Sequence, residues 1–179
     1  MSVVLADPGY TVDDLDWLRD EIGVAHLELD PWGSLIVSPA TDEHELAMTL
    51  LHEQALSQLD VPPGAVRSNG TPWAVAGGTG YLLMPDLMIL APGTQRVGEL
   101  GFEPPPLLVV EIASPSTRRI DRGRKLIDYR QGGAGVYLLV DLPNTFEAHE
   151  FATGRVMKAT GSIDLTVGGQ PLRFTLPST

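Results

Sequence analysis

Two carboxylates stand inside apolar segments that have the length of buried strands. Asp86 opens the run DLMIL (86–90), and Glu111 stands near the end of LLVVEI (107–112). A charge inside a buried strand is costly unless it is paired or bound to a metal. Two carboxylates on neighbouring strands can give oxygen ligands to Mg²⁺, which often binds substrate phosphates as well. The pattern predicts metal-assisted hydrolysis of phosphodiester bonds, with Asp86 and Glu111 as catalytic metal ligands.

Each carboxylate also has an ordinary structural explanation. Asp86 follows Pro85, so its side chain can cap a turn. Glu111 can accept hydrogen bonds from the SPST loop (114–117) or from an arginine. The segment that follows Glu111 favours the catalytic interpretation.

Arginines stand where the helix after the SPST loop is expected to begin. Cations at a helix N-terminus are disfavoured by about 0.3 to 1 kcal/mol each, because they face the positive end of the helix dipole. The free N–H groups of that turn bind phosphate, and added arginines strengthen such a site. We therefore predict that Arg118, Arg119 and Arg122 bind phosphate or a nucleic-acid backbone, with a solvated basic helix face as the alternative.

Asp121, Lys125 and Tyr129 recur four residues apart in the same segment. A helix places residues i, i+4 and i+8 on one face. The three side chains then lie together, beside the segment that carries Glu111. The plainer alternative is a surface salt bridge between Asp121 and Lys125, worth under about 1 kcal/mol.

The order of strand and helix patterns predicts one α/β (α+β) domain over residues 1–179. The patterns are a hairpin (26–38), a helix opened by Thr41 (42–59), buried strands (86–90 and 107–112), a helix ending near Gln131 and a third buried strand (136–141). Strand-length pieces then fill the tail, and we expect them to form a β-meander that covers one edge of the sheet.

Composition narrows the class of protein. Hydrophobic residues make up 43% and charged residues 20% of the chain, as in a globular protein. The net charge of −11 is uneven, because six of the 12 Lys and Arg lie between Arg118 and Arg130. The chain is thus not a protein that coats nucleic acid non-specifically. Without cysteine, and with no membrane-spanning or secretory segment expected, a cytoplasmic location is the expectation.

Two stretches, MPDLMIL (84–90) and LLVVEIASPSTRRIDRGRKLIDYRQGGAGVYLLVD (107–141), resemble the PD-(D/E)XK nuclease superfamily. Within it, the chain is similar to a small bacterial family described as "putative restriction endonuclease", a domain of unknown function. The resemblance runs from about Leu27 to Gly169, which would be the core of the domain. It includes HLELDPWGSLIVSPATDEHE (26–45), a strand, turn and strand followed by a helix that a histidine opens.

The resemblance implies a restriction-endonuclease-like core with a mixed central β-sheet flanked by helices and with extra C-terminal strands. It also implies that Asp86 and Glu111 bind the metal and that a lysine orients the attacking water or stabilises charge on the phosphorane. The usual position of that lysine, two residues after the acid, is Ala113 here, so Lys125 must substitute.

An extra ligand in this superfamily often comes from an early strand or helix. Candidates of this kind are Glu28, His44 and Glu45. Each also suits an ordinary role: His44 as a surface residue at a helix start, and Glu45 as a capping charge.

The leading hypothesis is a Mg²⁺- or Mn²⁺-dependent endonuclease that hydrolyses DNA, in which a homodimer would supply two cuts. The alternative is a catalytically silent nuclease-fold module for binding or assembly, which the acidity and Ala113 favour. Hydrolysis of another substrate ranks last, because the chain has no G-x-S-x-G, H-E-x-x-H or Walker-type glycine motif.

Overall fold

The structure of the protein is a computed structural model. The residues that the structure describes are 3–5, 10, 11, 14, 17, 18, 21, 27–29, 35–37, 41–68, 71–74, 82–97, 101–113 and 118–178. The SPST loop and the turn of the early hairpin lie outside them. Among the described residues, no helix is long and apolar enough to span a membrane.

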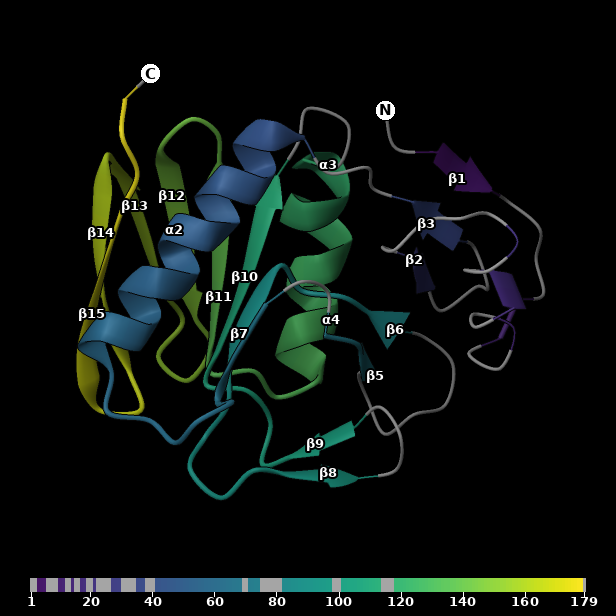
Figure 1. The fold of residues 1–179 in the computed structure, drawn as a ribbon, viewed down its shortest axis with the longest axis horizontal. Helices are drawn as coiled ribbons and strands as arrows, with labels where there is room; N and C mark the ends of the chain where they lie inside the picture. The colour runs from purple at the N-terminus through teal and green to yellow at the C-terminus, as the bar shows by residue number, and fades with distance from the viewer. Residues whose placement is uncertain are drawn as a thin grey trace.

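A six-stranded sheet with the order β13-β12-β11-β10-β7-β4 forms the centre of the molecule (Figure 1). Its strands are β4 (Val66–Ser68), β7 (Leu87–Ile89), β10 (Leu108–Ala113), β11 (Val136–Asp141), β12 (Thr145–Glu150) and β13 (Arg155–Thr160). Strands β10 and β11 are parallel and the other pairs are antiparallel, so the sheet is mixed. The predicted buried strands are confirmed, because β10 and β11 are buried at every residue.

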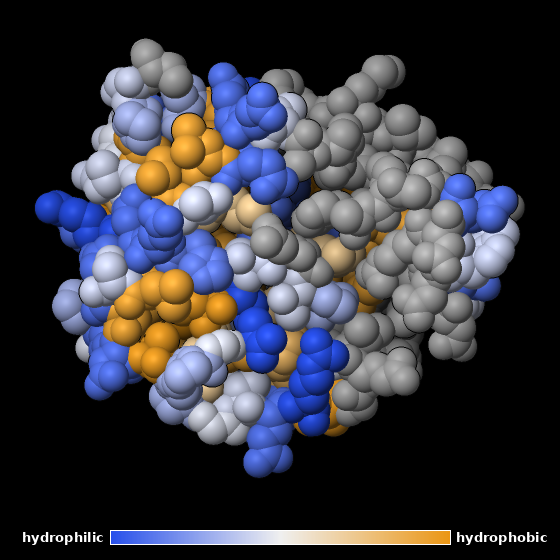
Figure 2. Space-filling model, in the orientation of Figure 1, coloured by the Kyte–Doolittle hydropathy of each residue, from blue (hydrophilic) through white to orange (hydrophobic). Residues whose placement is uncertain are grey.

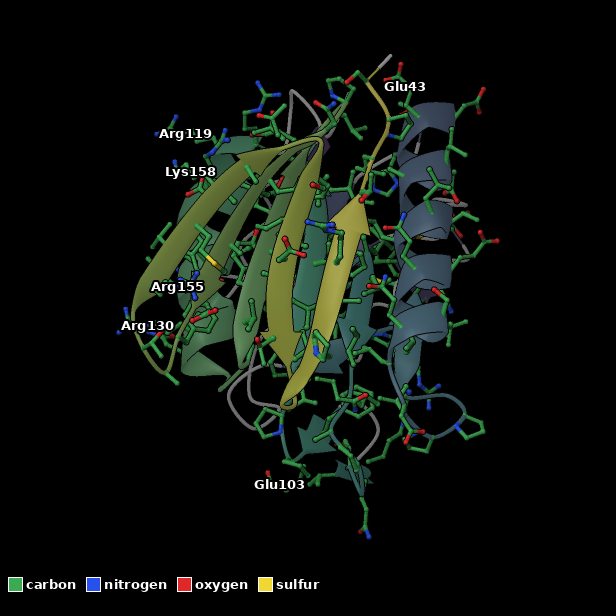
Figure 3. The ribbon with its side chains drawn as sticks, turned by 90° about the vertical axis from the view of Figure 1, so that its left-hand side faces the viewer. Glu43, Glu103, Arg119, Arg130, Arg155 and Lys158 are labelled. Atoms are coloured by element: carbon green, nitrogen blue, oxygen red, sulfur yellow. The ribbon has the colours of Figure 1, made fainter. Side chains whose placement is uncertain are left out.

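Helix α2 (Asp42–Gln58) covers one face of this sheet, as Figures 1 and 3 show. The Thr41 hydroxyl accepts a hydrogen bond from the His44 amide and so caps the first turn, as the sequence predicts. The helix contributes four buried side chains to the core, those of Ala47, Met48, Leu51 and Ala55. Its outer side still exposes Leu46 and Leu56, and Figure 2 shows hydrophobic patches on that face of the molecule.

A helical segment connects β10 to β11 and covers the opposite face. It consists of α3 (Arg118–Ile120), a π-helical turn η2 (Asp121–Lys125) and α4 (Leu126–Gln131). Each face of the sheet therefore has its own core. Leu108, Val110 and Ile112 join the core under α2, whereas Val109 and Ala113 join the core under α4. By the alternation of strand side chains, Glu111 belongs to the α4 face.

The C-terminal strands do not form the continuous meander that we expect. Strands β12 and β13 extend the sheet beside β11, but β14 (Ser162–Val167) and β15 (Gln170–Thr175) form a separate hairpin. The side-chain amides of Gln54 and Gln58 in α2 each exchange two hydrogen bonds with the backbone of β15, at 2.7–2.9 Å. These bonds satisfy backbone groups on the edge of β15 that does not pair with β14.

A second sheet has the order β1-β3-β2-β6-β5. Its strands are β1 (Val3–Leu5), β2 (Leu27–Leu29), β3 (Leu35–Val37), β5 (Trp73–Ala74) and β6 (Leu82–Leu83). Strands β2 and β3 pair antiparallel, which confirms the predicted early hairpin. A two-stranded sheet is formed by β8 (Gln95–Val97) and β9 (Gly101–Glu103). Strand β2 matters for the site because it carries Glu28.

The close approach of the chain before β10 to the chain before β11 can be tested at Gly135, with Gly123 as a control. A Cβ at Gly135 would lie 2.6 Å from the Leu107 carbonyl oxygen, whereas a Cβ at Gly123 in η2 meets nothing within 4 Å. We expect Gly135→Ala to lower the free energy of unfolding by about 1–3 kcal/mol through overpacking. Gly123→Ala is the matched control and should be neutral or stabilising by up to about 1 kcal/mol, since alanine favours helix. Urea denaturation measures both, and equal effects would contradict the prediction.

Candidate active site

Asp86 lies directly before β7 and reaches across to β10. Its Oδ2 accepts a hydrogen bond from the Ile112 amide at 2.7 Å, and its Oδ1 lies 3.1 Å from His44 Nε2. Because Leu87 pairs with Val110, this carboxylate lies beside the C-terminal half of β10. The fold thus brings Asp86 next to Glu111, as expected for a pair that shares one site.

Glu111 is buried on the α4 face of the sheet and has a partner on each carboxylate oxygen. Lys125 Nζ donates to Oε2 at 3.0 Å, and the Tyr129 hydroxyl donates to Oε1. Both partners come from the helical segment after β10. The predicted helix face is therefore real, although the turn from Asp121 to Lys125 is π-helical, a form that is frequent at functional sites.

Lys125 is only 5% exposed and lies between two buried glutamates. Its ammonium nitrogen is 2.8 Å from Glu28 Oε2 and 3.0 Å from Glu111 Oε2, with Asp121 Oδ1 at 3.7 Å. Glu28 is held in place by the Met84 amide, which donates to its Oε1 at 2.8 Å. The candidate Glu28 thus reaches the site, and the Asp121–Lys125 contact is buried rather than on the surface.

The pKa values of these groups shift for identifiable reasons. Burial raises the pKa of Glu111, and the nearby Lys125 lowers it. The carboxylates of Glu28, Asp86 and Asp121 raise it again, so the pKa ends well above its ordinary value. For Lys125, burial lowers the pKa, but the surrounding carboxylates raise it well above its ordinary value. The lysine therefore keeps its proton, and it faces more negative charge than it can neutralise.

Tyr129 and His44 respond to the same carboxylates. Burial raises the pKa of the Tyr129 hydroxyl, and Glu111 raises it further, so Tyr129 stays a hydrogen-bond donor. Burial lowers the pKa of His44, but the hydrogen bond with Asp86 raises it, and the net shift is upward. Nδ1 of His44 is buried without a hydrogen-bond partner among the described residues. His44 is thus a contact of the site rather than a surface residue.

The donor chemistry suits a hard divalent cation. Three buried carboxylates, those of Glu28, Glu111 and Asp121, surround the ammonium of Lys125, and a fourth, that of Asp86, acts on Glu111. Within the described part of the chain, no three His, Asp or Glu side chains are arranged to hold a metal, and Lys125 lies between Glu28 and Glu111. Mg²⁺ needs only one or two carboxylates, because water and phosphate oxygens complete its shell. Asp86 and Glu111 fit that requirement.

The arginines lie near the same end of the sheet but differ in their contacts. Arg118 Nε donates to Asp141 Oδ1 at 2.8 Å, and Arg122 donates to Asp141 Oδ2. Arg122 Nε also lies 3.7 Å from a Glu147 oxygen. Arg119 is exposed and has no ion pair with a described residue. Asp141 offsets the dipole penalty expected for cations at this helix start, a role that the sequence analysis missed although the VYLLVD pattern ends on this residue.

Of the three early candidates Glu28, His44 and Glu45, the described contacts leave only Glu45 outside the site. It is exposed on the first turn of α2, and its amide donates to the Thr41 carbonyl at 3.0 Å. Its carbonyl accepts a hydrogen bond from the Thr49 hydroxyl at 2.9 Å. These contacts agree with an ordinary position at a helix start.

The sequence of this chain matches a known protein family. A sequence model of the Uma2 family, described as "Putative restriction endonuclease", matches residues 19–157. The chain belongs to the Uma2 family. Its match contains Glu28, Asp86, Glu111 and Lys125, and the predicted family is thereby confirmed.

A solved structure has the same fold as this Uma2 chain. It is described as a "putative nuclease belonging to DUF820" from Anabaena variabilis, with 13% sequence identity and a TM-score of 0.62 over 85% of each chain. At that identity the match establishes the nuclease-like mixed fold alone. No curated protein matches the chain.

The burial of Lys125 predicts its effect on stability. Lys125→Met removes the cation and leaves the Glu28 and Glu111 carboxylates facing each other, so we expect a loss of about 3–5 kcal/mol in the free energy of unfolding. Arg173→Met is the control, because its ion pair with Asp164 is exposed and should be worth under about 1 kcal/mol. Urea denaturation at neutral pH measures both. Similar values for the two variants would contradict the structural role of Lys125.

Proposed function

We propose that this Uma2 protein is a metal-dependent endonuclease that hydrolyses DNA phosphodiester bonds. In this proposal Asp86 and Glu111 bind Mg²⁺ or Mn²⁺, and Lys125 assists the reaction. The observation that carries it is the buried contact of Asp86 with β10 beside Glu111, together with the lysine ammonium 3.0 Å from Glu111. Membership of a family described as "Putative restriction endonuclease" supports the choice of reaction.

The divalent cation would polarise the phosphodiester group and activate a water as the nucleophile. The protein's own groups fix the two carboxylates beforehand: the Ile112 amide orients Asp86, and the Tyr129 hydroxyl orients Glu111. Such outer contacts hold ligands in one orientation and raise affinity. The cluster of buried carboxylates adds a local negative charge that favours a divalent cation over the monovalent ions of the buffer.

Lys125 has the position and charge to stabilise the transition state. Its ammonium stays protonated among the carboxylates and can donate a hydrogen bond to a phosphoryl oxygen that gains negative charge. A lysine from the helix after β10 therefore replaces the one that the superfamily places two residues after the acid. Arg118, Arg119 and Arg122 border the site and would contact the DNA backbone, with Arg118 and Arg122 oriented by Asp141.

A catalytically silent module for binding or assembly is the second candidate. The observation in its favour is that the carboxylates already have partners: Lys125 for Glu28 and Glu111, and the Ile112 amide with His44 for Asp86. An ion network of this kind can serve packing alone. Metal binding and DNA cutting separate the two candidates.

Metal binding should stabilise the folded protein. At a concentration 100 times its Kd, a metal that binds only the folded state adds about 2.7 kcal/mol to the free energy of unfolding. We expect millimolar Mg²⁺ or Mn²⁺ to raise Tm for the wild type but not for Asp86→Ala or Glu111→Ala. Glu53→Ala, an exposed carboxylate on α2, is the control and should respond as the wild type does. Absence of any metal-dependent shift would favour the silent module.

Cutting of supercoiled plasmid tests the reaction itself. With Mg²⁺ or Mn²⁺ at low salt, we expect the wild type to cut and Asp86→Ala and Glu111→Ala to be inactive. Lys125→Ala should be slower by about 10²–10³, the usual effect of removing a group that stabilises developing charge. A linear product would indicate paired cuts, as a homodimer would make, and a nicked circle would indicate single cuts. Equal activity in all these variants would overturn the assignment.

A further inference from the structure

Charge is segregated along this acidic chain. Residues 118–160 contain eight Lys and Arg and five Asp and Glu, a net charge of +3, so the remaining residues carry −14. Non-specific affinity for nucleic acid comes from Lys and Arg that neutralise phosphates. If this Uma2 protein binds a polyanion, the segment that spans α3, α4 and β13 is where binding is favourable.

Four exposed cations of this segment lie along one side of the molecule, as Figure 3 shows. They are Arg119 in α3, Arg130 in α4, and Arg155 and Lys158 in β13. Strand β13 is the last strand of the central sheet, so its outer side has no neighbour in that sheet. We call these four residues the basic edge.

The acidic partners of the basic edge lie beneath its cations. The Arg155 and Lys158 side chains are 64% and 69% exposed, whereas those of Glu150 and Glu147, their partners at 3.8 and 3.0 Å, are 20% and 15% exposed. The guanidinium and ammonium groups are therefore more exposed to solvent than the carboxylates that pair with them. Arg119 and Arg130 form no ion pair with a described residue, so their charge is not offset locally.

The strand register connects Lys158 of the basic edge to the candidate active site. Glu111 pairs with Leu139, Leu139 with Glu147, and Glu147 with Lys158. Directly paired residues point to the same face of a sheet, so Lys158 and Glu111 share one face. Three strand spacings separate them, about 14 Å. That is shorter than one turn of duplex DNA, about 34 Å.

We propose that the basic edge binds the phosphate backbone of duplex DNA on one side of the phosphate that is cut. The inference rests on the proposed nuclease function, which needs DNA at Glu111, and it adds Arg130, Arg155 and Lys158 to the binding surface. It also explains how a chain of net charge −11 can hold DNA, because the substrate would follow the basic edge.

The salt dependence of DNA binding tests the basic edge without any need for catalysis. Binding of a short labelled duplex is measured by fluorescence anisotropy in EDTA, where no metal supports cutting. Each phosphate contact contributes about −0.9 to the slope of log K against log salt. Arg119→Gln/Arg130→Gln removes two cations without breaking an ion pair of the described residues, so we expect the slope to be shallower by about 1.8.

The expected loss of affinity follows from the same slope. The ratio of wild-type to double-variant affinity should shrink about tenfold between about 50 and about 200 mM salt. Arg173→Gln removes an exposed arginine from β15, outside the basic edge, and should keep the wild-type slope. A double variant with the wild-type slope would overturn the proposal.

Two further results separate the alternatives. If the slope is unchanged in the double variant while Glu111→Ala still abolishes plasmid cutting, the nuclease function stands and the basic edge does not. If the wild type fails to bind duplex but binds vesicles rich in anionic lipid, and Arg119→Gln/Arg130→Gln weakens that binding, the surface recognises membranes and the DNA proposal is wrong.

Discussion

The ammonium of Lys125 lies where water cannot reach it, so the protein must replace its hydration with charges of its own. The replacements come from three parts of the chain: Glu28 from β2, Glu111 from β10 and Asp121 from the turn before the lysine. Removing water from an ion costs several kcal/mol, and only close, well-oriented partners repay it. The ammonium of Lys125 thus connects the early sheet, the central sheet and the helical segment.

The same interaction leaves a charge imbalance that packing alone does not require. Burial and the carboxylates of Glu28, Asp86 and Asp121 raise the pKa of Glu111 more than Lys125 lowers it, and this raised pKa costs folding free energy at neutral pH. A fold selected only for stability would do better with apolar side chains at these positions. Unfavourable local arrangements of this kind tend to occur where function demands them. The imbalance supports the proposal that a divalent cation binds at this site.

The arginines after β10 divide into two groups by their partners. Asp141, which pairs with Ala113 across the two parallel strands, holds Arg118 and Arg122 at the end of the sheet. Structure alone accounts for those two. Arg119 and the cations of β13 face solvent instead, so stability gives little reason for them. The helical segment thereby presents two arginines that Asp141 fixes near the site, whereas Arg119 and the cations of β13 are exposed.

The sequence by itself determined the elements and the chemistry of the site. Local periodicity predicts α2, β10 and β11, and the cost of a charge inside an apolar run singles out Asp86 and Glu111 without knowledge of any contact. Spacing along one helix likewise places Lys125 and Tyr129 together. The resemblance to a nuclease family assigns a role to Lys125 and adds Glu28 and His44 as candidates.

Only the tertiary structure decided which distant residues meet. Glu28 lies 97 residues before Lys125, His44 reaches Asp86 from another layer, and β15 packs on α2 instead of continuing the sheet. Such contacts depend on sheet register and layer packing, where a slip of one residue turns every side chain to the other face. Periodicity within a segment carries no record of that register, because register is set by the partner strand and by the core that the two strands share.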